Sequence, residues 1–116
     1  MATQTQNLYV QLISSQKRNR YTELGLESRH SENELARVVS ESDQWTDHLV
    51  SILSVLEDES FWGAVSDLGA RIVLDIAVEP DDLRGSPYLA LRCQMRIIHW
   101  LVTRNVELEF TFYAGG

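Results

Sequence analysis

The chain has 116 residues, a length typical of one domain, and 44% of them are hydrophobic, which excludes a wholly disordered chain. The formal net charge of −7 disfavours binding to nucleic acid or to an anionic membrane surface, because both require basic patches. The acidity is concentrated in residues 41–82, which hold eleven acids and one base, Arg71, for a local charge of −10.

Targeting signals and disulfides are absent from the sequence pattern. Residues 1–6 lack the basic and then apolar order of a signal peptide, and no apolar run is long enough to span a membrane. The single cysteine, Cys93, cannot form an internal disulfide, and no His or acid stands beside it in a local catalytic signature. We therefore expect a cytoplasmic protein in which Cys93 packs as a small apolar residue.

The first third of the chain gives the weakest pattern. Residues 8–13 are rich in β-formers and predict a strand. Residues 17–28 fit a short helix or a continued strand, and the short helix is the preferred interpretation. Residues 35–40 predict a second strand, although Ser31 and Glu34 form a capping-box pattern that would instead begin a helix.

Two helices are predicted in the middle of the chain. Ser42 or Asp43 can cap the first, since a side-chain oxygen there accepts an unpaired backbone N–H. Residues 57–60 end this helix and cap the next, which stops at Gly69. Apolar residues recur at helical spacing in the first helix at Trp45, Leu49, Ile52, Leu53 and Leu56, and in the second at Phe61 or Trp62, Val65 and Leu68.

The last part of the chain predicts three strands and a helix. Residues 71–79 alternate between apolar and more polar positions, which favours a strand with one buried face. Residues 80–87 form a loop and residues 88–92 a short strand. Residues 94–104 predict a helix capped by Asn105, and residues 106–113 a final strand. The expected inward residues are Met95, Ile98, Leu101 and Val102 in the helix and Val106, Leu108, Phe110 and Phe112 in the strand; Arg71, Asp75, Glu107 and Glu109 are expected on the open sheet face.

These elements indicate one α+β domain over residues 1–116, with flexible tails at 1–6 and 114–116. Strands that neighbour strands, together with helices that each carry one apolar face, favour a two-layer sandwich. We expect a mostly antiparallel sheet of four to five strands with helices on one face.

A family resemblance is carried by the runs WTDHLVSILSVLEDESFWGAVSDLGARIVLDIAV and LALRCQMRIIHWLVTRNVELEFTFY. Asp47-His48-Leu49, Leu24-Gly25-Leu26-Glu27 and Phe112-Tyr113 fall in matching places. The chain resembles the bacterial family called domain of unknown function 4279. The resemblance implies a bacterial or phage origin and an accessory role, such as an immunity protein that neutralises a toxin; it brings no catalytic residues.

Catalytic and metal chemistry have little support in the sequence. His30, His48 and His99 are widely spaced and do not form a ligand pattern for zinc or iron. Asp43 and Asp47 share a helix face but fit a solvated helix surface better than an acid–base pair. The glycines match no phosphate-binding loop. We therefore expect no catalytic residues, no metal and no cofactor.

The acidic clusters are the preferred candidate site. Glu57, Asp58 and Glu59 lie between the two central helices, and Glu79, Asp81 and Asp82 follow the next strand. If both clusters meet at one edge of the domain, six carboxylates would attract a basic protein. Trp62 lies beside the first cluster and could anchor a partner, or pack in the core.

The leading hypothesis is a non-enzymatic protein-binding module, an immunity or inhibitor protein that covers a basic partner such as a toxin. The alternative is a small-molecule-binding or regulatory homodimer that pairs through an edge strand or through the open sheet face, and residues 106–113 could supply that edge. Neither hypothesis involves nucleic acid or a membrane. An enzyme with His48 beside Asp43 or Asp47 in a deep pocket is the third hypothesis.

Overall fold

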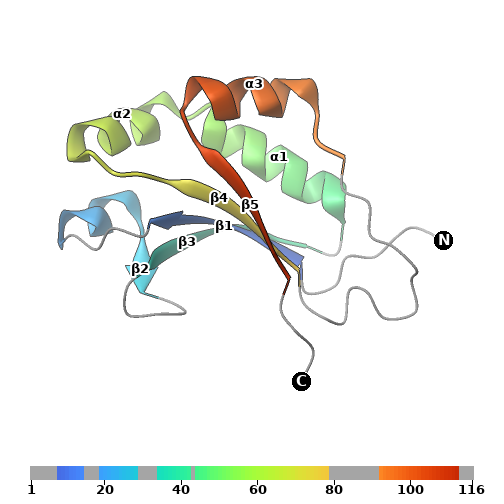
Figure 1. Ribbon diagram of the computed structural model, residues 1–116, viewed down its shortest axis with the longest axis horizontal. Helices are drawn as coiled ribbons and strands as arrows, with labels where there is room; N and C mark the ends of the chain where they lie inside the picture. Colours follow the sequence, from blue (N-terminus) through green and yellow to red (C-terminus); the bar gives the residue numbers. More distant parts are fainter. Residues whose placement is uncertain (1–7, 15–18, 29–33, 43, 79–91, 113–116) are drawn as a thin grey trace.

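The computed structural model describes residues 8–14, 19–28, 34–42, 44–78 and 92–112, which form a sheet covered on one face by helices (Figure 1). The elements in chain order are β1 (Leu8–Ser14), the 3-10 helix η1 (Asn19–Leu24), β2 (Glu27–Ser28), β3 (Leu35–Glu41), α1 (Trp45–Leu56), α2 (Glu59–Leu68), β4 (Val73–Val78), α3 (Met95–Thr103) and β5 (Glu107–Phe112). The expected α+β architecture, with a mostly antiparallel sheet and helices on one face, is confirmed.

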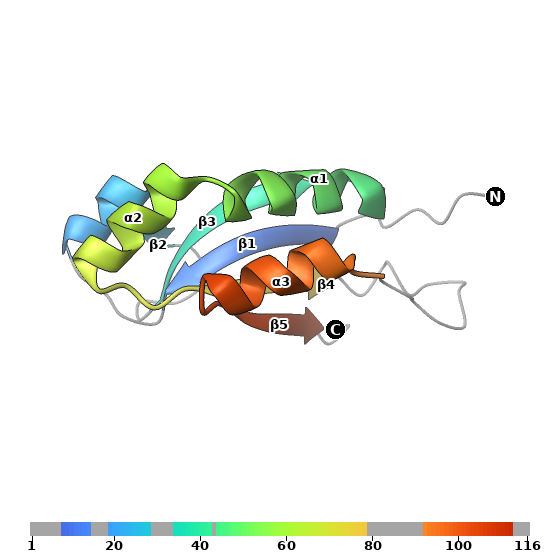
Figure 2. The same cartoon turned by 90° about the horizontal axis from the view of Figure 1, so that it is seen from above.

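The five described strands lie in the order β2-β3-β1-β4-β5. β1 pairs with both β3 and β4 in the antiparallel sense, and β2 pairs antiparallel with β3. β4 and β5 are parallel. A parallel neighbour requires a crossover connection, and α3 lies on that connection above the sheet (Figure 2). The final strand therefore lies at the edge of the described sheet, next to α3.

The N-terminal third resolves both alternatives left open by the sequence. Residues 19–24 form a 3-10 helix, so the short helix is confirmed, and Gly25 follows it with φ 79°. Residues 35–41 form β3, so a helix through this segment is wrong. β3 pairs with β1 along six positions, and this ladder outweighs the local capping-box pattern.

The helices begin and end close to where the sequence places them. Gln44, rather than Ser42 or Asp43, is the N-terminal flanking residue of α1, and its side chain makes no capping bond. Ser42 instead accepts a hydrogen bond from the Gln44 N–H and donates one to Asp47. In α2 the predicted cap is confirmed, because the Asp58 carboxylate accepts from the Phe61 N–H at 3.1 Å. Gly69 ends α2 in the left-handed conformation.

The main core lies between the helices and one face of the sheet. Its strand members include Val10 and Leu12 on β1 and Leu74 and Ile76 on β4, which are fully buried. The alternation predicted a wetter opposite face of β4. Asp75 and Ala77 lie on that face and are buried as well. β4 lies between β1 and β5, and on this face the side chains of Gln11 and Thr111 from those strands flank Asp75. Arg71 precedes β4 and is exposed, as are Glu107 and Glu109.

Two predicted inward faces are only partly buried. α3 buries Leu101 as expected, together with Ile97, whereas Met95, Ile98 and Val102 are exposed. Leu108, Phe110 and Phe112 of β5 are paired with core residues of β4 but are themselves exposed, because no described strand lies beyond β5. Val106 is buried as expected. The expected strand at 88–92 and both expected tails lie outside the described residues, apart from Arg92, which is not in a strand.

Candidate functional site

The acidic turn, defined as Glu57, Asp58 and Glu59, connects α1 to α2. Two of its three carboxylates already have partners within the chain. Glu57 accepts a hydrogen bond from Arg96 of α3 at 2.6 Å, and Asp58 caps α2. Glu59 lies in the first turn of α2, where a negative charge is favoured by the helix dipole. The acidic turn therefore contacts α3 and caps α2. Arg96 neutralises part of the charge that was expected to attract a basic partner.

Trp62 belongs to the core. It is 6% exposed, and its indole Nε1–H donates to the Val55 carbonyl at 2.8 Å. The Phe61 ring meets it edge-on with the ring centroids 5.0 Å apart. This arrangement ties α2 to the last turn of α1 and leaves little of the indole available to a partner.

The second acidic group, Glu79, Asp81 and Asp82, lies outside the described residues. The last described residue before it in the chain is Val78, at the end of β4. Leu8 pairs with Val78 and its neighbour Tyr9 pairs with Glu41, so Val78 ends beside the segment that leads into α1. The 12 residues of α1 extend about 18 Å from there to the acidic turn. Figure 1 shows β4 running back past the turn. Val78 therefore lies farther from the acidic turn than one Debye length of about 10 Å.

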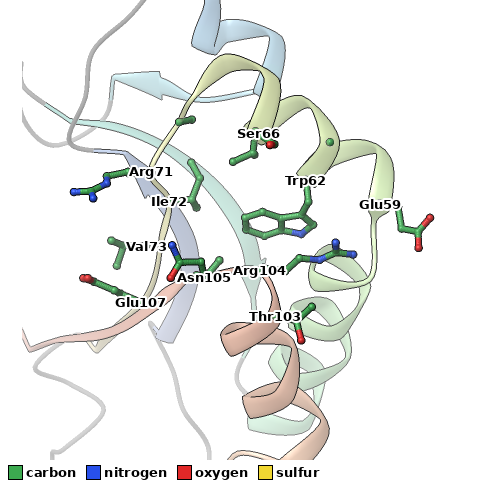
Figure 3. Close-up of a pocket in the computed structure, with 14 residues that line it drawn as sticks. Glu59, Trp62, Ser66, Arg71, Ile72, Val73, Thr103, Arg104, Asn105 and Glu107 are labelled. Carbon is green, nitrogen blue, oxygen red and sulfur yellow. The ribbon is translucent and has the colours of Figure 1, made fainter.

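A groove with a volume of ≈ 770 Å³ lies between α2 and the connection from α3 to β5. Figure 3 shows Trp62, Thr103 and Arg104 along one part of it and Arg71 and Glu107 along another. Arg71 and Arg104 are balanced by Glu59 and Glu107, so the lining carries no excess charge. The groove therefore favours no charged ligand over another.

Arg104 supports the groove wall. Its Nε–H donates to the Leu56 carbonyl at 3.0 Å, and its guanidinium lies over the Trp100 ring, 4.7 Å from the centroid. Its Nη2 atom is buried and has no hydrogen-bond partner among the described residues. Because that atom is sealed from solvent, a molecule in the groove could not reach it without a rearrangement. Arg104 therefore joins α3 to α1.

His48 is fully buried on α1 and does not line the groove. Its Nε2 lies 2.9 Å from the Ser42 carbonyl, which can only accept, so Nε2 carries the proton. Burial lowers the pKa of His48, and the Ser42 carbonyl and the Asp47 charge oppose that shift less strongly. The geometry fits a neutral structural histidine. Asp43, the other half of the predicted carboxylate pair, lies outside the described residues.

Metal ligands do not converge in the part of the chain that the structure describes, where no group of three or more His, Cys, Asp or Glu side chains could hold an ion. Cys93 is half-buried, and burial raises the pKa of its thiol. A raised pKa keeps the thiol protonated and weakens it as a nucleophile.

A polar cluster lies on the sheet face away from the helices. Asp75 of β4 accepts hydrogen bonds from Gln11 of β1 at 2.9 Å and from Thr111 of β5 at 2.6 Å. The sequence placed Asp75 on a wet face and did not predict these contacts. Since Gln11 and Thr111 come from different strands, only the strand order brings them to Asp75.

Of the seven large apolar residues that are exposed among the described residues, six lie on α3 and β5. We define these six as the α3–β5 face: Met95, Ile98, Val102, Leu108, Phe110 and Phe112. Each of these side chains exposes between 38% and 78% of its surface. On α3 the three residues lie at helical spacing i, i+3 and i+7, on the flank opposite Arg96, which turns toward α1. Figure 2 shows α1 and β5 on opposite sides of α3.

The β5 part of this face continues the core surface of the sheet. Leu108, Phe110 and Phe112 pair in register with Leu74, Ile76 and Val78, so all six side chains point to the helix layer. The outward flank of α3 and the helix-side surface of β5 thus lie at the same edge of the described sheet (Figure 2). Contiguous exposed apolar surface of this kind is typical of interaction sites.

No helix among the described residues has the length and apolar character needed to cross a bilayer. Comparison with family models, curated proteins and solved structures found no match to this chain.

Proposed function

We propose that this chain is a protein-binding module and that it binds through the α3–β5 face. The partner recognised by such a face is a protein that presents an extended edge strand together with apolar side chains. Among the described strands β5 is the last of the sheet, so no described strand pairs with its outer side, and α3 exposes apolar side chains beside it. An added strand would form main-chain hydrogen bonds with β5 and would bury the apolar side chains of α3.

The observation that carries this proposal is the exposure of six large apolar residues on two neighbouring elements, α3 and β5 (Figure 2). Single exposed apolar residues are ordinary on protein surfaces, and Val50 on α1 is such a case, at 69% exposure. A helix flank and an edge strand that expose apolar residues together are not ordinary, because water disfavours contiguous apolar area.

The predicted inhibitor of a basic partner has weaker support than a module that binds through apolar contact. That hypothesis requires free carboxylates at the acidic turn, but Glu57 and Asp58 are engaged within the chain. The immunity role and the cytoplasmic location remain predictions from the sequence.

Site-specific photo-crosslinking in cells that naturally produce the protein tests the proposal. A photoreactive phenylalanine analogue replaces Ile98 in the α3–β5 face and, as the matched control, Val50 on α1. We expect a discrete protein adduct from position 98 that position 50 does not give. The adduct is identified by mass spectrometry and re-formed from purified components. Equal background at both positions would remove the proposal.

A further inference from the structure

We infer that the partner of the α3–β5 face is a second copy of this chain, joined by antiparallel pairing of the two β5 strands. The inference rests on the proposed function and names the partner for that surface. The five described strands of each copy would then form one continuous sheet with the helices of both copies on one face. The copies are related by a two-fold axis, which is the symmetry of most homodimers. Here the axis is normal to the sheet.

The charge pattern of β5 selects one register for this pairing. Helix-side residues must oppose helix-side residues, so only registers that shift the strands by two residues are compatible. Centring the axis on Glu109 places Glu109 against its own copy, and centring it on Leu108 places Glu107 against Glu109. Like charges directly opposite each other are destabilising.

Centring the axis on Phe110 avoids both conflicts. Leu108 then opposes Phe112 of the second copy, and Glu109 opposes Thr111 of the second copy. Five described residues, 108–112, remain paired with every apolar residue facing an apolar residue. Moving the axis on to Thr111 leaves only three of the described β5 residues paired. β5 is therefore self-complementary in one register.

The exposed apolar area of the α3–β5 face is close to the area that each partner buries in a dimer. A large apolar side chain has on the order of 150–200 Å² of surface, so six side chains at 38% to 78% exposure supply roughly 600 Å² per copy. A standard interface buries about 800 Å² per partner, and polar residues at the rim supply the difference. The largest apolar patches on monomers are about 300–600 Å², so this face is at the upper limit for a chain that remains alone.

The helix layer also fits. Figure 2 shows α3 above the β4 and β5 side of the sheet. Strands are spaced by about 4.8 Å, so continuing the sheet through β5 would place the two α3 axes roughly 10–14 Å apart. The flank of Met95, Ile98 and Val102 would fill that space, above the Phe110 and Phe112 side chains. The sequence pattern expected the three α3 residues to be buried, and a second copy would bury them.

The dimer is tested by sedimentation velocity of the full chain at concentrations up to roughly 1 mM. We expect a species of twice the chain mass. Val102→Glu should raise the dimer Kd at least about tenfold, because it buries a carboxylate without a partner. Val50→Glu makes the same change at a similar exposure, 69% against 76%, outside the face and should leave Kd unchanged.

The register is tested by disulfide formation in a Cys93→Ser background. Phe110→Cys places two thiols on the axis and should give a crosslinked dimer under mild oxidation. Leu108→Cys is the control, since its counterpart in the second copy would lie about four residues away along the strand, beyond the reach of a disulfide. Crosslinking through position 108 but not 110 would overturn the register.

A wild-type chain that stays monomeric at all concentrations would overturn self-association, as would a dimer that Val102→Glu leaves intact. Neither result removes the proposed function, which fails only if position 98 gives no specific adduct. An adduct with a different protein would support the function and reject the second copy. A monomer in which Met95 and Phe112 resist solvent labelling would mean that another part of the same chain covers the face.

Discussion

The side chains of Gln11 and Asp75 hydrogen-bond across β1 and β4 at 2.9 Å, and each residue is only 1% exposed. Their positions are directly paired in the antiparallel ladder. A carboxylate at such a site requires donors, because a buried polar group without a partner costs free energy. Gln11 and Thr111 supply them from the two strands that flank β4.

The effect of replacing Asp75 on stability should therefore depend on whether the new side chain can accept hydrogen bonds. Asp75→Ala leaves the donors of Gln11 and Thr111 buried and unpaired, and we expect a loss of about 2–4 kcal/mol in the free energy of unfolding. Asp75→Asn should cost less, because Gln11 can turn its unpartnered Oε1 toward the new amide. Urea unfolding of both variants measures the difference; an equal loss would mean that the hydrogen bonds contribute little.

Two glycines of α2 should respond to the same substitution with opposite signs. Gly63 lies inside the helix with open space around its missing side chain, so Gly63→Ala should stabilise the protein by about 0.5–1 kcal/mol. Gly69 ends the helix at φ 65°, where a side chain is strained, so Gly69→Ala should destabilise it by about 1 kcal/mol. Thermal unfolding of the two variants compares them; the same sign for both would contradict this backbone assignment.

Protonation of His48 should make the protein less stable in mild acid. Burial lowers the pKa of His48 in the folded state below 6.5, the ordinary value of a histidine side chain. The stabilising effect is therefore complete above pH 6.5 and is lost as the pH falls below it, because the unfolded chain takes up the proton first. Urea unfolding between pH 7.5 and 5 measures the slope, which approaches about 1.4 kcal/mol per pH unit for one proton.

His48→Gln should flatten this slope, since an amide can still donate to the Ser42 carbonyl without titrating. His99 is exposed, and His99→Gln is the matched control for the change of a histidine to a glutamine. A slope that survives His48→Gln would assign the pH dependence to another group.

Adjacent carboxylates of the acidic turn should differ in their contribution to stability. Asp58→Ala removes the cap of α2 and should cost about 1 kcal/mol. Glu57→Ala breaks a surface pair with Arg96, whose side chain is 62% exposed, and should cost less than about 0.5 kcal/mol. Urea unfolding at low and high salt separates the two, because screening weakens the surface pair far more than the cap.

The acidic hypothesis shows why charge counted along the sequence is a weak guide to a site. Eleven acids lie in residues 41–82, but the described carboxylates differ in the residues that they contact. Glu57 meets Arg96 from a helix 39 residues away, and Asp75 lies inside the sheet. Neither contact leaves a trace in the local pattern, so the sequence could not distinguish an attractive surface from structural carboxylates.

The sequence by itself determined most of the secondary structure, since turns and helix ends depend on neighbours along the chain. The Asp58 cap, the end of α2 at Gly69 and the strand at residues 73–78 all follow from such local chemistry. Tertiary structure alone decided which apolar faces are buried. β5 joined the edge of the sheet in parallel with β4, and α3 turned Ile97 and Leu101 inward, leaving Met95, Ile98 and Val102 outside. Burial depends on which elements cover a residue, and in an edge strand or an outer helix that covering comes from distant parts of the chain or from another molecule.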